Sequence, residues 1–266
     1  MMQESSDISR IAPAQLRRLC RDGAFDGPTS GFAAGHVQAN MVILPKAYAD
    51  EFADYCARNP KPCPVLEVLQ PGDPEPATCA PGADVRTDLP RYKVFRDGKP
   101  IAEPLDIAAL WRDDLVTFLL GCSFTAEEAL SEAGLPLHHI DQTGFVPMFT
   151  TSIATEPAGI FSGPMVVTMR PFTAEEAAQA AAITSHYPMG HGAPIHRGDP
   201  AAIGISDLAA PDYGMPVSMS GDQIPLFWAC GVTPQEAIRN ARPELAITHA
   251  PGHMFVSDVT AASTRI

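Results

Sequence analysis

The chain has 266 residues, 45% of them apolar and 18% charged, so it can bury a substantial core and is not of the intrinsically disordered class. Its 18 Lys and Arg residues stand against 31 Asp and Glu residues, and the net charge of -13 excludes a nucleic-acid partner. The same charge opposes an anionic ligand at long range, so a carboxylate ligand must be held by individual arginines or by backbone N–H groups.

Residues 1–13 are polar, and the longest apolar run, residues 115–124, is too short to span a bilayer. We therefore expect no membrane partner and a cytoplasmic location. The six cysteines have no CxxC spacing, which predicts free thiols in a reducing compartment.

Two helices are predicted near the start of the chain. Leu16 and Leu19 have helical spacing within residues 11–22, and Pro45 precedes a second amphipathic run over residues 46–59. Residues 60–90 are rich in Pro and Gly around one short strand at 65–69, so most of this stretch is an ordered loop.

Three later segments share one order: an apolar run, a short turn, and a Thr-x-x-Glu sequence that opens a helix. They are residues 115–123 before Thr125, residues 165–170 before Thr173, and residues 224–230 before Thr233. Each Thr-x-x-Glu predicts a capping box, so we expect structural roles for Glu128, Glu176 and Glu236. The first apolar run is also compatible with a buried helix. Further strands are predicted at residues 37–44, 91–95, 145–153, 246–249 and 254–259.

This alternation predicts the α/β class: a layered α/β/α domain with a mixed sheet, plus a smaller two-layer α+β insertion. We place the main domain at residues 1–112 and 189–266 and the inserted domain at residues 113–188. In such folds a ligand binds beyond the carboxyl ends of the strands.

The turns before the predicted helices carry the first candidate site residues, Cys122, Ser123 and Cys230. A helix N-terminus favours an anion and can depress the pKa of a cysteine, although both cysteines are equally compatible with small buried apolar residues. Arg170 ends an otherwise apolar strand, where its guanidinium can bind a substrate carboxylate or pair with a neighbouring acid.

The second group of candidates lies in a Gly- and Pro-rich stretch at residues 191–200. His191 and His196 are candidate acid-base groups, and Asp199 could orient one of them. The alternative is that Asp199 caps a turn and one histidine only binds backbone.

A third group surrounds Pro251 and Gly252, which prevent His249 and His253 from sharing a metal-binding helix. Both are candidate substrate-binding residues, and with the earlier histidine loop they could still assemble a metal site. Arg91 is a further candidate for the substrate carboxylate, although a local salt bridge explains it as well.

Nine strings resemble the hydro-lyase, or D-glutamate cyclase, family and cover nearly the whole chain in order. They are residues 35–40 (GHVQAN), 63–67 (CPVLE), 86–92 (RTDLPRY), 121–124 (GCSF), 146–148 (VPM), 169–171 (MRP), 191–196 (HGAPIH), 227–234 (FWACGVTP) and 248–254 (THAPGHM). The resemblance implies a lyase that eliminates water, with cyclisation of D-glutamate to 5-oxo-D-proline in some members. Family members often carry Arg where Thr150 stands, so a carboxylate other than glutamate is an alternative ligand.

On this basis we expect an enzyme that acts on a small carboxylate metabolite by acid-base catalysis. Arg170 or Arg91 would hold the carboxylate, His191 and His196 would transfer protons, and the turns at Cys122 and Cys230 would form a backbone cradle. No organic cofactor and no bound metal is expected, and a homo-oligomer is possible. A metal-dependent hydrolase that uses the histidine loops and a non-catalytic carboxylate-binding protein are the alternatives.

Overall fold

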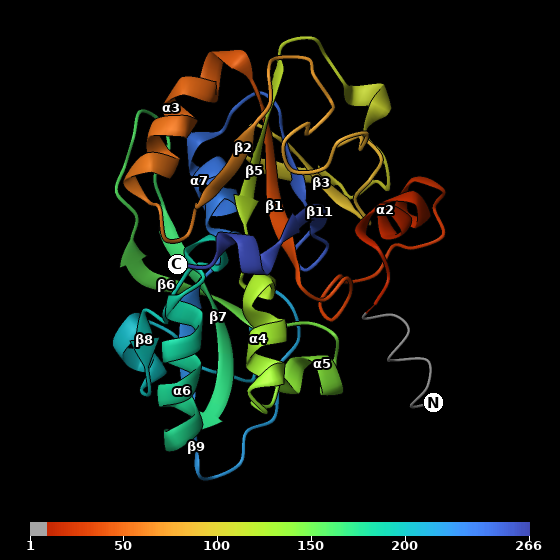
Figure 1. The fold of residues 1–266 in the computed structure, drawn as a ribbon. Helices are drawn as coiled ribbons and strands as arrows, with labels where there is room; N and C mark the ends of the chain where they lie inside the picture. The colour runs from red at the N-terminus through yellow and green to blue at the C-terminus, as the bar shows by residue number, and fades with distance from the viewer. Residues whose placement is uncertain (1–9) are drawn as a thin grey trace.

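The computed structural model describes residues 10–266, which form two β-sheets flanked by helices (Figure 1). The larger sheet has the order β2-β5-β1-β10-β3-β4, and β11 also pairs with β1. Alternate residues of β1 enter different apolar clusters, as Met41 and Val42 do, so this sheet carries core on both faces. Its strands are β1 (His36–Pro45), β2 (Val65–Val68), β3 (Tyr92–Arg96), β4 (Lys99–Ala102), β5 (Leu115–Gly121), β10 (Ala246–His249) and β11 (Phe255–Thr260).

The smaller sheet has the order β6-β7-β9-β8. Its central strands β7 and β9 are paired over seven residues, from Val167 opposite Ala229 to Thr173 opposite Gln223. The strands are β6 (Met148–Ala154), β7 (Pro164–Thr173), β8 (His196–Arg197) and β9 (Gln223–Ala229).

The predicted α/β class is confirmed, but each ladder within residues 10–266 is antiparallel, where a mixed sheet was expected. Connectivity explains the difference. The helices after β5 lead to β6 in the smaller sheet, and the helix after β9 leads to β10 in the larger sheet. They link the two sheets, whereas a parallel pair needs a crossover that returns to the same sheet.

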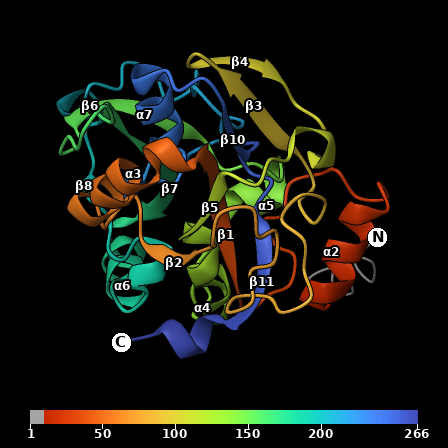
Figure 2. The ribbon, with the colours of Figure 1, turned by 90° about the horizontal axis from the view of Figure 1, so that it is seen from above.

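The helices cover the sheets on several sides. Aromatic and aliphatic side chains from α3 and α7, including Phe52 and Ile238, pack with Phe118 of β5. Figure 2 shows α2 and α3 at opposite sides of the larger sheet. None of the helices within residues 10–266 is long and apolar enough to cross a membrane. The helices are α2 (Pro13–Arg21), α3 (Lys46–Arg58), α4 (Glu127–Glu132), α5 (His138–Gln142), α6 (Ala174–Ser185) and α7 (Thr233–Ala241).

One of the three predicted capping boxes forms. Thr173 and Glu176 cap α6 reciprocally, as expected. The other two predictions are wrong, because α4 begins later than predicted, at Glu127, and Thr233 bonds to the backbone of Val166 on β7 instead of to its own helix. A tertiary contact therefore replaces the local cap at Thr233, and a 3-10 turn at Ser123–Ala126 displaces it at Thr125.

The two sheets draw strands from both sides of the predicted domain boundaries. β5 lies within residues 113–188 but belongs to the larger sheet, whereas β8 and β9 lie outside that range and belong to the smaller sheet. The proposed division into a main and an inserted domain stays a prediction.

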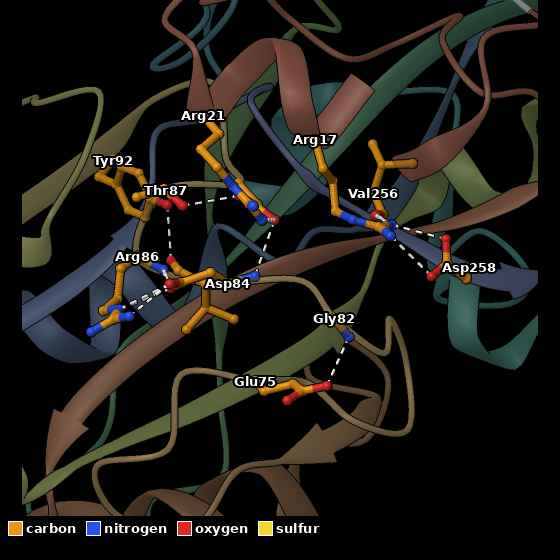
Figure 3. Close-up of polar contacts among 12 residues, drawn as sticks. Arg17, Arg21, Glu75, Gly82, Asp84, Arg86, Thr87, Tyr92, Val256 and Asp258 are labelled. Carbon is orange, nitrogen blue, oxygen red and sulfur yellow. Dashed lines mark hydrogen bonds and ion pairs between the residues drawn. The ribbon is translucent and has the colours of Figure 1, made fainter. Parts of the chain in front are cut away.

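Ion pairs attach α2 to β11 of the larger sheet and to the loop between β2 and β3 (Figure 3). Arg17 donates to the backbone oxygen of Val256 at 2.8 Å and to both carboxylate oxygens of Asp258. Arg21 binds both oxygens of the buried Asp88 at 2.7 and 2.6 Å. We call Arg17, Arg21, Asp88 and Asp258 the α2 cluster.

Candidate functional site

A buried ion cluster lies where the two sheets meet. Arg170, on β7 of the smaller sheet, donates from Nη2 to Oε1 of Glu127 at 2.8 Å. Nε2 of His139, on α5, lies 2.8 Å from the same oxygen. The three side chains are at most 7% exposed, so the charges of Arg170 and Glu127 attract each other with little screening by water. We call Arg170, Glu127 and His139 the central cluster.

Neighbouring groups fix the carboxylate and the imidazole. Ser30 donates to Oε2 of Glu127 at 3.0 Å, and the ring of Phe124 stacks on His139 with 6.4 Å between centroids. Burial alone would raise the pKa of Glu127, but His139 and Arg170 outweigh it and hold that pKa below its ordinary value. Burial lowers the pKa of His139, against the attraction of Glu127.

Arg170 keeps unused hydrogen-bonding capacity. Besides its bond to Glu127 it reaches Ser123 Oγ at 3.2 Å and Thr168 Oγ1 at 3.3 Å, and its guanidinium lies 5.6 Å from the ring centroid of Trp228. Its buried Nε–H has no partner within residues 10–266. A buried donor without an acceptor is costly, which favours a ligand oxygen or an ordered water at this position.

A narrow crevice adjoins the central cluster at the ends of β5 and β9. Asn40 of β1 donates to the backbone oxygen of Gly121 at 2.6 Å. A Cβ on Gly231 would lie 1.9 Å from the Asn40 amide nitrogen, so only glycine fits in that turn. The free space is about 10 Å³, close to the minimum for one water molecule. The polar and sulfur-bearing residues that line it include Asn40, Cys122, Ser123, Thr168, Cys230 and His249.

The structure brings Cys122, Ser123, Cys230 and Arg170 together, and of the two alternatives for the cysteines it agrees with small buried apolar residues and not with a depressed thiol pKa. Burial raises the pKa of Cys122, and it raises that of Cys230 to about 11, although the positive charge of Arg170 opposes both shifts. Burial outweighs the position next to a helix because desolvating a thiolate is expensive. Both side chains are neutral thiols at pH 7.

Two buried imidazoles, His249 in the wall of this crevice and His191, carry their ring protons on different nitrogens. His191 Nδ1 lies 2.8 Å from the backbone oxygen of Lys61, which can only accept, so the proton is on Nδ1 and Nε2 carries a lone pair. The shorter contact of His249 Nδ1 is with the Met41 N–H at 3.1 Å, which places its proton on Nε2. Burial lowers the pKa of both imidazoles to about 4, and the charge of Arg170 contributes at His191. Neither Nε2 has a partner within residues 10–266.

His196 and Asp199 are not brought to this site. His196 lies opposite Phe227 in the β8–β9 pair, and Nε2 contacts the backbone oxygen of Asp199 at 2.7 Å. Phe227 in turn lies opposite Met169, and adjacent strand residues face opposite sides, so Arg170 points to the other face of the sheet. The Asp199 carboxylate caps the turn at Pro200–Ile203. This is the turn-capping alternative noted above.

Arg91 and His253 also lie apart from the central cluster. Arg91 forms an exposed ion pair with Asp26 at 2.7 Å, which matches the salt-bridge alternative. His253 Nδ1 lies 2.9 Å from the backbone oxygen of Pro251, and its ring contacts Phe145 at a centroid distance of 6.0 Å. Within residues 10–266 no three His, Cys, Asp or Glu side chains converge in a way that could hold a metal ion.

Glu127, His139 and Asn40 belong to this site, although no sequence motif singled them out. An arginine on an apolar strand requires a buried counter-charge, and of the adjacent Glu127 and Glu128 only one can face inward at the start of a helix. Asn40 is likewise an amide in an apolar run. These were usable signals, but sequence spacing does not say which acid meets Arg170.

The part of the chain that contains this site also matches a known protein family. A family described as D-glutamate cyclase matches residues 116–258, which include the central cluster and both cysteine turns. A protein of Bordetella pertussis named "Putative hydro-lyase" is 58% identical over 245 residues, covering 92% of this chain and 88% of the relative. Proteins with the same name from Stutzerimonas stutzeri and Bacillus licheniformis are 53% and 52% identical, covering 94% and 95% of this chain and 94% and 96% of the relatives.

One solved structure, a nitrogen repressor-like protein from Methanococcus jannaschii, aligns over 86% of this chain and 90% of that chain. Its sequence identity is 11% and its TM-score is 0.38, too low to bear on the fold or the function.

Proposed function

This chain is a lyase of the D-glutamate cyclase family, and from that premise we propose that it closes D-glutamate to 5-oxo-D-proline with loss of water. The observation that carries the proposal is the buried Arg170, whose Nε–H has no partner within residues 10–266. Such a guanidinium suits the α-carboxylate of an amino acid.

The reaction joins two groups of one molecule. The amine nitrogen forms a bond to the carbon of the γ-carboxyl group, and the bond from that carbon to one oxygen breaks. Nitrogen loses two protons, and the departing oxygen gains two and leaves as water. Because both groups are already in one molecule, holding them in contact can supply several kcal/mol of the barrier, on the order of known proximity effects.

Proton transfer requires an acceptor near the amine and a donor near the departing oxygen. His191 has a lone pair on Nε2, so in this proposal it takes each proton from the nitrogen and passes it to the departing oxygen. His249 has a proton on Nε2 and donates a hydrogen bond to that oxygen. Positioned acid-base groups of this kind contribute roughly 10²- to 10⁴-fold. His196, the second acid-base candidate from the sequence, has no part in this proposal, because it lies on the opposite face of the smaller sheet from Arg170.

The crevice must widen to admit the substrate. Its free space of about 10 Å³ accommodates one water-sized group, far less than a five-carbon amino acid. The boundary between the two sheets is the natural place for this movement, because α4 and α7 link them there.

The proposal is tested by incubating the purified protein with D-glutamate and following proton NMR spectra. We expect the signals of 5-oxoproline to replace those of D-glutamate, and L-glutamate, the matched control, to react much more slowly. Unchanged D-glutamate together with dehydration of a hydroxy acid would retain the lyase class and reject the cyclase assignment. Binding of D-glutamate without turnover of any candidate would instead indicate a binding protein.

A further inference from the structure

A second cavity, of about 430 Å³, is lined by Glu127, which also binds Arg170 of β7. It is bounded by the segment 31–38, by the start of α4 and by α5, which Figure 1 shows next to one another. We call it the acidic cleft. The large polar and aromatic residues that define it are Gln38, Phe124, Glu127, Glu128, Glu132 and Asp141.

Carboxylates dominate the acidic cleft. Four carboxyl groups line it, and no Lys or Arg does, so His36 is its one basic residue. Glu128, Glu132 and Asp141 are exposed and have no ion pair within the described part of the chain. Such a lining repels a free carboxylate and attracts a cation.

A buried amide oxygen provides an independent second sign of a ligand. Gln38 is 3% exposed, and its Nε2 donates to the backbone oxygens of Thr29 and Phe32 at 2.9 and 3.1 Å. These two bonds fix the orientation of the amide, and its Oε1 is left without a partner within residues 10–266. A buried acceptor in a cavity wall is best satisfied by a donor on the occupant.

The remaining wall is apolar. Phe124 and Leu137 are buried, and Phe32 and Ile140 are partly buried around the same cavity. The face of an aromatic ring attracts an ammonium group, and the aliphatic side chains suit a short hydrocarbon tail. These apolar side chains offer no ligand atoms to a metal ion.

We infer that the acidic cleft binds a small alkylammonium ion, with its N–H groups directed to Gln38 Oε1 and the carboxylates and its hydrocarbon part against Phe124. This site is separate from the crevice at Arg170, and its occupancy does not depend on the proposed reaction. Glu127 lines the acidic cleft and binds Arg170, so an occupant would adjoin the ion pair that Arg170 forms.

Calorimetric titration of the full-length protein with n-butylammonium chloride tests this inference. 1-Butanol and sodium butyrate serve as neutral and anionic ligands of similar size. We expect n-butylammonium to bind at least ten times more tightly than 1-butanol, and butyrate not to bind. Equal affinity for the cation and the alcohol, or no binding of the cation, would overturn the inference.

Variants locate the site. The double substitution E128Q/D141N removes two exposed charges from the acidic cleft, and we expect it to weaken n-butylammonium binding about tenfold. E175Q/D54N removes two exposed charges from α6 and α3, away from the cleft, and should leave the affinity within about twofold. Equal affinities of these two variants would contradict the assignment, and their melting temperatures check that both are folded. Q38L should weaken binding further, because it removes the buried acceptor.

Discussion

The α2 cluster and the central cluster are both built from arginines and carboxylates, but they differ in how completely their hydrogen bonds are satisfied. Arg17 and Arg21 each form two bonds to one carboxylate, and no polar atom of either side chain is buried without a partner. Around Arg170, buried atoms of three side chains lack partners within residues 10–266: Arg170 Nε, His191 Nε2 and Thr125 Oγ1.

In the proposed function, this difference separates the structural arginines of α2 from the ligand-binding Arg170. A fully satisfied network stabilises one arrangement, whereas a partly satisfied one leaves donors and acceptors for a ligand. Strength of ion pairing does not distinguish the clusters, because Arg21 to Asp88 at 2.6 Å is shorter than Arg170 to Glu127 at 2.8 Å. The two clusters differ in their buried polar atoms without hydrogen-bond partners, and substitutions in each cluster test whether this difference matters for function.

The largest expected effect is on activity in R170M. The substitution removes the proposed carboxylate-binding group and leaves Glu127 buried with only His139 and Ser30. Loss of one partner from a buried charge pair between protein and ligand costs about 2 to 5 kcal/mol of binding, so we expect kcat/KM for D-glutamate to fall by roughly 30- to 5,000-fold. Steady-state kinetics on the folded variant measure it.

R17M is the matched control for R170M. It also replaces a buried arginine by methionine, but in the satisfied cluster, so kcat/KM of its folded fraction should stay within about threefold of the wild type. Similar losses of activity in both variants would show that the two clusters do not differ in function.

The next largest effect is an expected fall of kcat in H191A, for which H196A is the control. His191 has an unpartnered Nε2 beside Arg170, whereas His196 bonds the backbone of Asp199 behind the smaller sheet. We expect kcat to fall about 10²- to 10³-fold in H191A, as for loss of a positioned base, and to be nearly unchanged in H196A. If H196A were the more impaired enzyme, the proposed proton acceptor would be wrong.

Sequence patterns located most elements because their signals are local. Residues 246–249 were predicted as a strand and form β10 with the same bounds, and Pro45 preceded the predicted helix that is α3. The sheet to which a strand belongs, and the direction of its neighbours, cannot be predicted from the local sequence. The apolar run 115–121 looks alike in a parallel or an antiparallel sheet, and only its pairing with β1 and β2 decides the arrangement.

The site was predicted in part for the same reason. Cys122 and Cys230 directly follow β5 and β9, so their convergence followed from the strand-turn-helix pattern. Arg170 was predicted to end its strand but lies within β7, which continues to Thr173. His191 and His196 are five residues apart in one loop, and no sequence rule says that β8 separates them onto different sides of a sheet. Glu127 was missed because Glu128 fitted a capping box that a 3-10 turn at Ser123–Ala126 displaced.

The buried histidines near the central cluster and the carboxylates near the α2 cluster should reduce the free energy of unfolding in different pH ranges. Burial holds the pKa of His191 and His249 at about 4, while an unfolded histidine titrates near about 6.5. The unfolded chain therefore binds more protons between these values, and the free energy of unfolding falls as pH drops from about 6.5 to 4. Near the α2 cluster, burial alone would raise the pKa of Asp84, but Arg86 lowers it overall. That contribution is present above the ordinary carboxyl pKa and is lost only as pH falls through the lower folded value.

The substitution H249Q tests the loss of unfolding free energy between pH 6.5 and about 4. It removes one buried imidazole, so the loss of unfolding free energy between pH 6.5 and 4 should be smaller than in the wild type by about 3 kcal/mol. Urea denaturation at a series of pH values gives this difference. An identical pH dependence in both proteins would mean that His249 is not held neutral in the folded state.

The smallest expected effect is the stability loss in R17M, compared with R112M. The Arg17 side chain is 5% exposed and also binds the backbone of Val256, whereas Arg112 is 39% exposed and pairs with the exposed Asp114 and Glu244. We expect urea denaturation to show a loss of about 2 kcal/mol for R17M, because Val256 O loses a buried donor, and less than about 0.5 kcal/mol for R112M. Equal losses would mean that the bonds of Arg17 to β11 add nothing beyond a surface ion pair, and the α2 cluster would then not be what holds α2 on the sheet.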